Sequence, residues 1–535
     1  MSDTMPPGKV TNPKLTLYAF HLRNNLAQGY DEPVDDANHL WEQCQQLGQK
    51  LNIPRLESLI ERLQDNNGNI GLAPSKDNPK SDYLELLQKE RLLNFSAISD
   101  GSTLQLRGEV YPLQIHDTYA VDITLRYPYS DVEVHQLGGL NHQGCLLLDS
   151  SNSSLGQTLV LFAQSVGDIQ DTQAFAEACL TAILPKPEAE KFLLSPPVKG
   201  TFLGSPIFEY ENNQDNAAQN GHILIWLNCH PQTETLEEAG DYYQPLINLL
   251  CCRHKILYVY SESRWCNHEA RILYKQLETQ RKRLRKLPSE PAEKLIQLQH
   301  LITETIQLAF DYANHLRDLA VHRNTIEANG KNYCFWLKQL QAISIEGEDN
   351  LDFWQQLINR IQEKFIEQIG VDLAYLIPAQ QLFQQMIDTI RGMVEILAEE
   401  QAQVREQQDK ERDRNLQTTI AVVGVGIGFT GLAAASFPYL IPPDAKTTPI
   451  PLQPPFTSGS LHPFISVLLL SLIFGFLGAG VAKVVTMLIS LCSDKRAKLK
   501  SSPKNQLLNQ ANTPEVGQVT GVQQKVEIPT QPPRK

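Results

Sequence analysis

Two cysteines and two histidines recur in a pattern that could bind a metal ion. Cys252 and His254 are followed by Cys266 and His268, so the motif C-x-H occurs twice. Thiolate sulfur and imidazole nitrogen are common zinc ligands in proteins. The spacing differs from that of common structural zinc modules, and Cys252 ends an apolar stretch. We therefore favour buried cysteines with exposed histidines, and keep a zinc site as the alternative.

A second polar set lies in an apolar stretch near the C-terminus. Asn415, Thr419, Gly426 and Thr430 recur at intervals of four, seven and four residues, which places them on one stripe of a helix. Polar groups in a membrane span usually face a bundle interior or a water-filled path. These residues are candidate pore-lining residues, provided that several subunits contribute. In the alternative, the hydroxyls bond back to their own helix and the glycine serves packing alone.

The stretch around these residues is long enough to cross a bilayer. From Leu416 to Ile441 there is no charged residue in 26 positions, and from Phe464 to Ala482 there is none in 19. About 20 apolar residues in a helix cross the hydrocarbon core. We predict transmembrane helices over residues 416–441 and 464–492, with an outer loop over residues 442–463.

Small residues in both predicted spans are spaced for close helix packing. Glycine and alanine three or four residues apart let two helix backbones approach each other. The candidate helix-packing residues are Gly424, Gly428 and Gly431 in the first span and Gly475, Gly478 and Ala479 in the second. A G-x-G-x-x-G match in the first span lacks a strand–turn–helix context, and we interpret it as accidental.

Basic residues flank the two spans and predict their orientation. Arg405, Lys410, Arg412 and Arg414 precede the first span, five Lys or Arg residues follow the second within residues 493–504, and the outer loop carries only Lys446. Because basic residues stay on the cytoplasmic side, both termini are expected in the cytoplasm, at an inner or plasma membrane. Residues 493–535 are basic and then rich in Pro, Gln and Thr, which predicts a disordered tail.

Composition narrows the class of protein. The chain has 535 residues and a net charge of −13, which argues against a dedicated nucleic-acid binder. Its mean hydropathy of −0.28 is typical of a soluble body with a membrane anchor. We find no P-loop, G-x-S-x-G, H-E-x-x-H or kinase signature. We therefore predict neither an enzyme nor a bound cofactor.

The N-terminal half has the pattern of an α+β domain with a mixed sheet, expected over residues 14–262 after a disordered segment, 1–13. Period-two alternation and apolar runs predict strands, and polar starts predict helices. Strands are expected at Leu15–Phe20, Tyr119–Tyr127, Thr158–Ala163, Ile223–Leu227 and Lys255–Tyr260, and helices at Asp35–Leu51, Arg55–Leu63, after Asp171, and at Thr235–Leu250.

An all-helical region is expected over residues 263–377. Its first helix ends in the basic run 281–286, and the next, from Pro291 to Gly330, carries a heptad of Leu295, Ile302, Ala309 and Leu316 alternating with Leu298, Thr305, Tyr312 and Leu319. This seam predicts an antiparallel partner helix. Further helices are expected at Tyr333–Ile343 and Leu351–Ile369.

A long stalk helix over residues 378–415 is expected to run on into the first span. Pro378 suits a first helical turn. One apolar face is predicted from Leu382, Met386, Ile390, Met393, Val394 and Leu397.

This order of parts resembles the CorA-type divalent-cation channels, in which a cytosolic α/β domain and extra helices precede a long helix, two spans and a basic tail. The segment Trp226–Pro231 is similar to the family's Trp-apolar-Asp…Pro-Thr segment, with Asn228 in place of the acid. The resemblance implies a homopentamer around a central pore and a divalent cation as a possible ligand. The family's Gly-Met-Asn motif is missing, since residues 436–440 read Ser-Phe-Pro-Tyr-Leu. Magnesium selectivity is therefore not implied.

The expected function is that of a homo-oligomeric ion channel or transporter gated by its cytosolic domain, with the bilayer and its own copies as partners. One alternative is a ligand-gated membrane effector, to which the β-rich region 95–230 points. A cavity lined by the basic run 281–286 would favour that alternative, and clustered carboxylates between subunits would favour cation sensing. The other alternative is a membrane-anchored coiled-coil scaffold that transports nothing.

Overall fold

The computed structural model describes residues 8–26, 33–63, 83–87, 90–98, 104–147, 154–167, 169–212 and 221–404. The chain divides into two units, Met1–Arg405 and Glu406–Lys535, and every described residue belongs to the first. The two expected spans, the loop between them and the C-terminal tail lie outside the described residues. Within these ranges, no helix combines the length and the apolar character needed to cross a bilayer.

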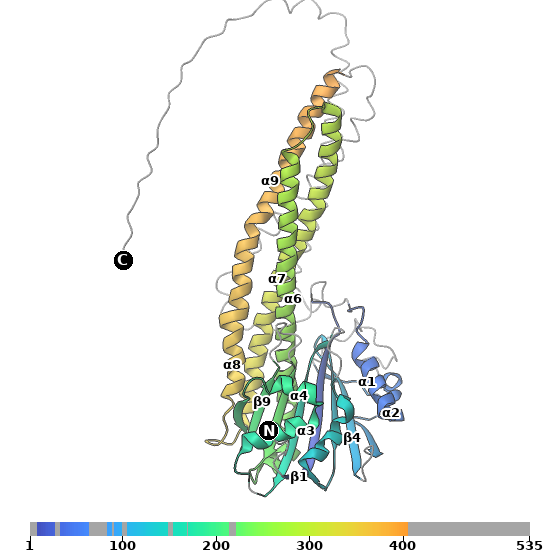
Figure 1. Cartoon of the computed structure of the whole chain (residues 1–535), viewed down its shortest axis with the longest axis vertical. Helices are drawn as coiled ribbons and strands as arrows, with labels where there is room; N and C mark the ends of the chain where they lie inside the picture. The colour runs from blue at the N-terminus through green and yellow to red at the C-terminus, as the bar shows by residue number, and fades with distance from the viewer. Residues whose placement is uncertain are drawn as a thin grey trace, which may run out of the picture. The chain divides into compact units, whose positions relative to one another are not determined.

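In the described part of the chain, ten strands form one mixed sheet (Figure 1). Along the sheet the order is β2-β4-β5-β1-β7-β10-β9-β8, with β3 paired to β4 and β6 to β1. The β7–β10 pair is parallel and the other pairs are antiparallel. The predicted α+β class with a mixed sheet is confirmed. The strands are β1 (Lys9–Leu22), β2 (Tyr83–Glu85), β3 (Leu93–Ile98), β4 (Gln105–Ile115), β5 (Thr118–Arg126), β6 (Asp131–Glu133), β7 (Ser154–Val166), β8 (Val198–Phe202), β9 (Ser205–Glu211) and β10 (His222–Asn228).

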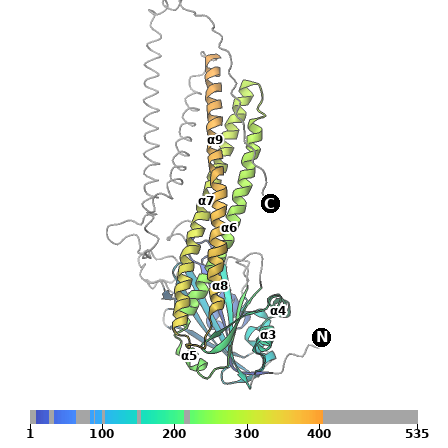
Figure 2. The same cartoon turned by 90° about the vertical axis from the view of Figure 1, so that its left-hand side faces the viewer.

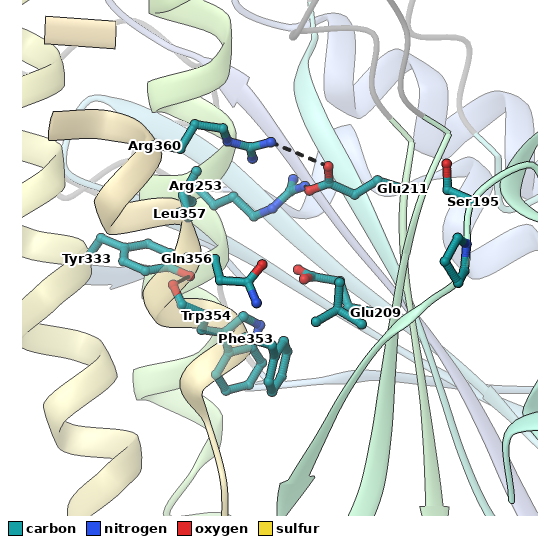
Figure 3. A pocket seen from close by; sticks show the side chains of 12 residues that line it. Ser195, Glu209, Glu211, Arg253, Tyr333, Phe353, Trp354, Gln356, Leu357 and Arg360 are labelled. Carbon is teal, nitrogen blue, oxygen red and sulfur yellow. Dashed lines mark hydrogen bonds and ion pairs between the residues drawn. The ribbon is translucent and has the colours of Figure 1, made fainter. Parts of the chain in front are cut away.

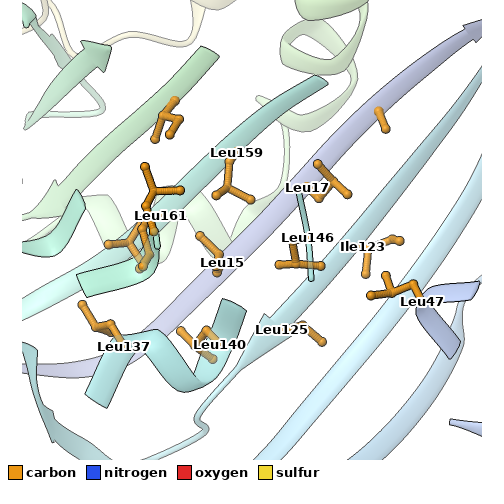
Figure 4. Close-up of a cluster of buried hydrophobic side chains, with 14 of the residues drawn as sticks. Leu15, Leu17, Leu47, Ile123, Leu125, Leu137, Leu140, Leu146, Leu159 and Leu161 are labelled. Atoms are coloured by element: carbon orange, nitrogen blue, oxygen red, sulfur yellow. The ribbon is translucent and has the colours of Figure 1, made fainter. Parts of the chain in front are cut away.

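One face of the sheet forms the main hydrophobic core (Figure 4). Alternate strand residues point to the same face, so Leu15 and Leu17 of β1 join Leu159 and Leu161 of β7 in that core. Short helices cover this face: α1 (His39–Lys50), α2 (Pro54–Glu57), η1 (Ile60–Arg62), η2 (Val134–Gly144), α3 (Thr172–Ile183) and α4 (Lys186–Phe192). Asp171 caps α3 by accepting hydrogen bonds from two backbone N–H groups, as its sequence position predicts.

The opposite face of the sheet packs against the first half of α6 (Tyr243–Leu284), which follows the short helix α5 (Thr233–Ala239). The residues of β1 that alternate with Leu15 and Leu17 point toward α6. The ring of Tyr18 lies 6.3 Å from that of Tyr243, and the ring of Phe20 lies 5.6 Å from that of His254, measured between ring centroids. The sheet therefore lies between two helical layers, and α6 covers the face that the short helices leave open.

Beyond the sheet, α6 continues into a bundle with α7 (Pro291–Ala342) and α9 (Glu367–Val404) (Figures 1 and 2). The row Leu298, Thr305, Tyr312 and Leu319 of α7 is buried, whereas of the other predicted row only Leu316 is buried. The short connection after α6 makes α7 its antiparallel partner, as predicted. Tyr312 also bonds α9, donating to the carbonyl oxygen of Leu376 at 2.7 Å.

The predicted strand Lys255–Tyr260 is wrong, because these residues lie in the middle of α6. Residues 246–257 are all buried, between the sheet on one side and other helices on the other. The five apolar residues Ile256–Tyr260 fit a buried strand as well as a buried helix, and periodicity cannot separate the two over so short a run. The predicted helix Thr235–Leu250 is likewise interrupted, since α5 ends at Ala239 and is followed by Gly240, whose φ of +76° is left-handed.

Three further expectations are corrected. Pro378 does not begin a helix, because α8 (Asp352–Arg360), the π-helical turn η4 (Ile361–Ile366) and α9 follow one another without a break. The flanking residues Leu376 and Ala379 are buried, so tertiary packing holds the helix across the proline. The expected helix Tyr333–Ile343 is the end of α7. Disorder over residues 1–13 is wrong from Lys9 onward, where β1 begins.

Candidate functional site

A pocket of about 230 Å³ lies where the sheet meets the helices (Figure 3). Its walls come from β8 and the segment before it, from β9, and from α6, α7 and α8. It is lined by Ser195, Pro196, Val198, Glu209, Glu211, Arg253, Tyr333, Phe353, Trp354, Gln356, Leu357 and Arg360. Charged and aromatic groups from distant parts of the sequence thus converge on one cavity.

Strand alternation places both carboxylates of the pocket. Phe208 and Tyr210 of β9 point into the main core, so Glu209 and Glu211 point to the opposite face, toward α6. Arg253 of α6 meets them there although its side chain is almost fully buried, with 1% of the residue exposed. From α8, Trp354 and Arg360 close the pocket on the other side.

Glu211 is the charge that joins these elements. Its carboxylate forms an ion pair with the guanidinium of Arg253. The guanidinium of Arg360 lies 3.7 Å from the same carboxylate, and a dashed line marks this second ion pair in Figure 3. Burial alone would raise the pKa of Glu211, but the two guanidinium groups outweigh it and lower that pKa to about 2. Glu211 is therefore ionised at neutral pH and ties the sheet to both α6 and α8.

Three N–H groups of pocket residues have no acceptor among the described residues. They are Nη1 of Arg253, Nε of Arg360 and Nε1 of Trp354. Buried donors in native proteins are nearly always bonded, and an exception calls for a specific explanation such as a ligand. All three are donors and two belong to cations, so the complementary group is an acceptor with negative charge.

From Glu209 a chain of hydrogen bonds leads behind the pocket wall. His222 Nε2 lies 2.8 Å from Glu209 Oε1, and Thr158 Oγ1 lies 2.8 Å from both His222 Nδ1 and His254 Nε2. Burial lowers the pKa of both histidines well below the usual value, so both are neutral. Burial also raises the pKa of Glu209 to about 7. These hydrogen bonds connect the carboxyl group of Glu209, at the pocket, to His254 of α6.

Thr158, His222 and Glu209 have the order of a nucleophile, a base and an acid, as in hydrolase triads. Thr158 is fully buried, however, and its hydroxyl is shared by two histidines. A nucleophile must reach a substrate, so this geometry favours a structural or proton-linked role over covalent catalysis.

The four residues of the predicted zinc motif do not meet. All lie on α6, and the 14 residues from Cys252 to Cys266 separate them by roughly 21 Å along the helix. Both cysteines are buried and His268 is exposed, as the favoured interpretation holds. His254 is buried, contrary to it, because its ring packs on Phe20 and bonds to Thr158. A single zinc site formed by this set is therefore wrong.

The basic run 281–286 does not line the pocket either. Arg281 is 28 residues beyond Arg253 on the same helix, about 40 Å away. The pocket's cations were missed in the sequence, although Arg253 directly follows the apolar residues Leu249–Cys252, where a buried charge requires a partner. The candidate pore-lining and helix-packing residues, from Asn415 to Ala479, lie outside the described residues.

Comparison of the chain with known proteins finds no matching family model, no matching curated protein and no matching solved structure. The resemblance to CorA-type channels therefore stays a prediction from the sequence pattern, neither supported nor refuted by these comparisons.

Proposed function

We propose that this protein is a ligand-gated membrane effector of CorA-like architecture, which senses a small anion in the pocket between sheet and helices. The observation that carries the proposal is the set of three unpartnered donors, from Arg253, Arg360 and Trp354, in one pocket. Buried donors without acceptors favour an anionic ligand bearing phosphate or carboxylate oxygens, which would complete their hydrogen bonds.

The charges and the size of the pocket restrict the ligand. Two arginines face one carboxylate that is ionised at neutral pH and a second, Glu209, whose pKa is about 7. With Glu209 protonated, Arg253, Arg360 and Glu211 leave a net charge of +1, so a monoanion is accommodated better than a dianion or a divalent cation. A volume of about 230 Å³ is below the usual range for drug-sized ligands, roughly 300–1,000 Å³, so the ligand is small. Phe353 and Trp354 provide an apolar wall for its uncharged part.

The pocket has a direct connection to the C-terminal part of the chain. Arg360, the last residue of α8, is followed at once by the π-helical turn η4 and then by α9. Segments of π-helix occur frequently at functional sites. Phe365 of η4 stacks on Tyr260 of α6, with ring centroids 4.0 Å apart. A ligand that draws Trp354 and Arg360 toward the sheet would shift η4 against α6, and α9 carries that shift to Val404.

Beyond Val404, the proposal relies on the two predicted spans, 416–441 and 464–492, with both termini in the cytoplasm. A conduit lined by Asn415, Thr419, Gly426 and Thr430 requires a homo-oligomer, a pentamer by the resemblance. Four exposed apolar residues of α9, Val371, Tyr375, Leu382 and Ile396, are 4, 7 and 14 residues apart and so form one stripe. An exposed apolar stripe supports the self-association that the pore requires.

Anion binding is tested on the full-length protein by thermal unfolding at constant ionic strength. The probes are inorganic phosphate and a panel of small phosphorylated and carboxylated metabolites. We expect at least one probe to raise the unfolding temperature, and Arg360→Gln to weaken its binding by at least tenfold. Arg391→Gln is the matched control, since Arg391 lies on α9 outside the pocket. Equal loss in both variants, or no stabilising anion, would contradict the proposal.

Gating is tested with the protein reconstituted in liposomes. Ion flux should depend on the anion found above, and Arg360→Gln should remove that dependence while a closed, intact protein remains. Native mass spectrometry of the solubilised protein should give one discrete oligomer. A monomer or dimer cannot enclose a central pore, and would favour the non-transporting scaffold instead.

A further inference from the structure

A cysteine, a histidine and an aspartate from two helices come together outside the pocket. Cys266 lies on α6, and His315 and Asp318 lie on α7. One ligand atom of each, a thiol sulfur, an imidazole nitrogen and a carboxylate oxygen, all lie within 4.8 Å of one another. We propose that this cluster binds a zinc-type divalent cation that joins α6 to α7.

The helical backbone of α7 places two of the three proposed ligands, His315 and Asp318, where they can bind the same ion. His315 and Asp318 are three residues apart on a helix, so their side chains project from the same face. That face meets α6 at Cys266, which is 2% exposed. A tetrahedral zinc ion with one sulfur and two lighter ligands needs ligand atoms about 3.5 Å apart, so side-chain movements of roughly 1.3 Å or less would close the site.

The surroundings of the cluster favour a cation. Nδ1 of His315 is buried and has no partner among the described residues. The ring is held in place by Trp265, whose plane meets it edge-on at a centroid distance of 5.4 Å. The negative charges of Asp318 and Glu262 act on the Cys266 sulfur, and they favour a bound cation beside it.

Arg317 is the competing charge. It donates hydrogen bonds of 2.8 and 3.0 Å to Asp318, both to Oδ1, so it uses one of the two carboxylate oxygens. Its own side chain is 56% exposed, so solvent screens this pair and the arginine can move away. A cation that also has sulfur and nitrogen ligands therefore competes with Arg317 on favourable terms.

The ligand set selects the class of metal. Sulfur and imidazole ligands suit zinc and its neighbours, whereas magnesium and calcium take oxygen ligands. Three protein ligands leave a fourth position open to water or to another group. The site is therefore distinct in chemistry from a magnesium site, and it lies roughly 20 Å along α6 from Arg253, so it does not depend on the anion pocket.

The test uses the full-length protein, reduced and treated with a chelator, and Co²⁺ as the probe. A bound Co²⁺ reports its thiolate through a sulfur-to-metal charge-transfer band and its tetrahedral geometry through intense visible bands. We expect one equivalent to bind, Zn²⁺ to displace it, and excess Mg²⁺ to have no effect. Cys266→Ser should remove the charge-transfer band, and His315→Gln should weaken Co²⁺ binding by at least tenfold.

Two controls keep the result specific. Cys334→Ser removes a half-buried thiol on α7, and Cys229→Ser removes an exposed thiol beside His230. Both variants should keep the charge-transfer band. Because His315 is only half-buried, His315→Gln is expected to fold even if Cys266→Ser does not, and helical circular dichroism checks this. A wild-type protein without the band, or one whose band survives in His315→Gln at unchanged affinity, overturns the proposal.

Discussion

The guanidinium of Arg360 in α8 lies 3.7 Å from the carboxylate of Glu211 in β9, which also pairs with Arg253 of α6. The carboxylate of Glu211 therefore links the sheet to α6 and to the C-terminal end of α8. Because Arg253 and Glu211 are largely buried, the pair depends on both members being present.

Replacing Arg253 should strongly destabilise the folded protein. We expect Arg253→Met to lower the free energy of unfolding by about 3–5 kcal/mol, because it leaves the buried Glu211 with Arg360, 3.7 Å away, as its remaining cation. The double variant Arg253→Met/Glu211→Gln should recover part of that loss. Urea unfolding followed by circular dichroism measures both. In the control Arg391→Met, which removes a pair within α9, the expected cost is below about 1 kcal/mol. Equal costs at the two arginines would contradict this account of Glu211.

The raised pKa of Glu209 predicts a pH effect of definite sign. Its pKa is about 7 in the folded protein against 4.5 unfolded, so the folded state keeps a proton that the unfolded state releases between these values. Stability therefore falls as pH rises from about 4.5 to about 7, by up to about 3 kcal/mol from this group. The neutral histidines of the network oppose this trend. Glu209→Gln keeps those histidines and lacks the carboxyl group.

The measurement for Glu209 is the difference in unfolding free energy between wild type and Glu209→Gln across that pH range. We expect wild type to lose stability relative to the variant as pH rises. Parallel curves would show that Glu209 titrates normally.

Gly156 occupies a position where a side chain does not fit. Its φ is +142°, and an added Cβ would lie 2.4 Å from Nδ1 of His254. Gly156→Ala should therefore destabilise the protein by at least about 3 kcal/mol, through backbone strain and displacement of His254. Gly167→Ala is the matched control, since Gly167 has a φ of +97° with open space around it, and should cost only the strain, about 1–2 kcal/mol. Thermal unfolding distinguishes the two, and equal losses would argue against a tight approach of His254.

The exposed stripe on α9 predicts the surface of self-association. A charge in the stripe, Tyr375→Glu or Leu382→Glu, should shift the oligomer toward smaller species in native mass spectra, because it places a carboxylate in an apolar contact. Ile377→Glu is the control, as Ile377 is 50% exposed on the same helix but off the stripe. If all three variants assemble like wild type, the stripe is not the contact.

The sequence by itself determined the elements whose patterns are local. The segment Leu15–Phe20 and the period-two pattern of residues 119–127 predict strands, and the seven-residue repeat from Leu298 to Leu319 predicts a packed seam with an antiparallel partner. Both are confirmed, because each depends on neighbours a few residues away. The predicted apolar face of α9 is confirmed for Met386, Ile390, Val394 and Leu397, whereas Met393 is half-buried and Leu382 is 39% exposed.

Only the tertiary structure decided whether residues Lys255–Tyr260 form a helix or a strand, and which residues make up the pocket and the metal cluster. That run lies in a helix and not in the sheet, because α6 packs over residues 246–257 between the sheet and other helices, an arrangement that the run's own residues do not encode. The pocket joins residues as distant as Glu209 and Arg360, and the metal cluster joins Cys266 to His315 rather than to His268. Fourteen residues along one helix keep Cys252 and Cys266 apart. The antiparallel packing of α6 and α7 instead brings Cys266 close to His315, which is about 50 positions later in the sequence.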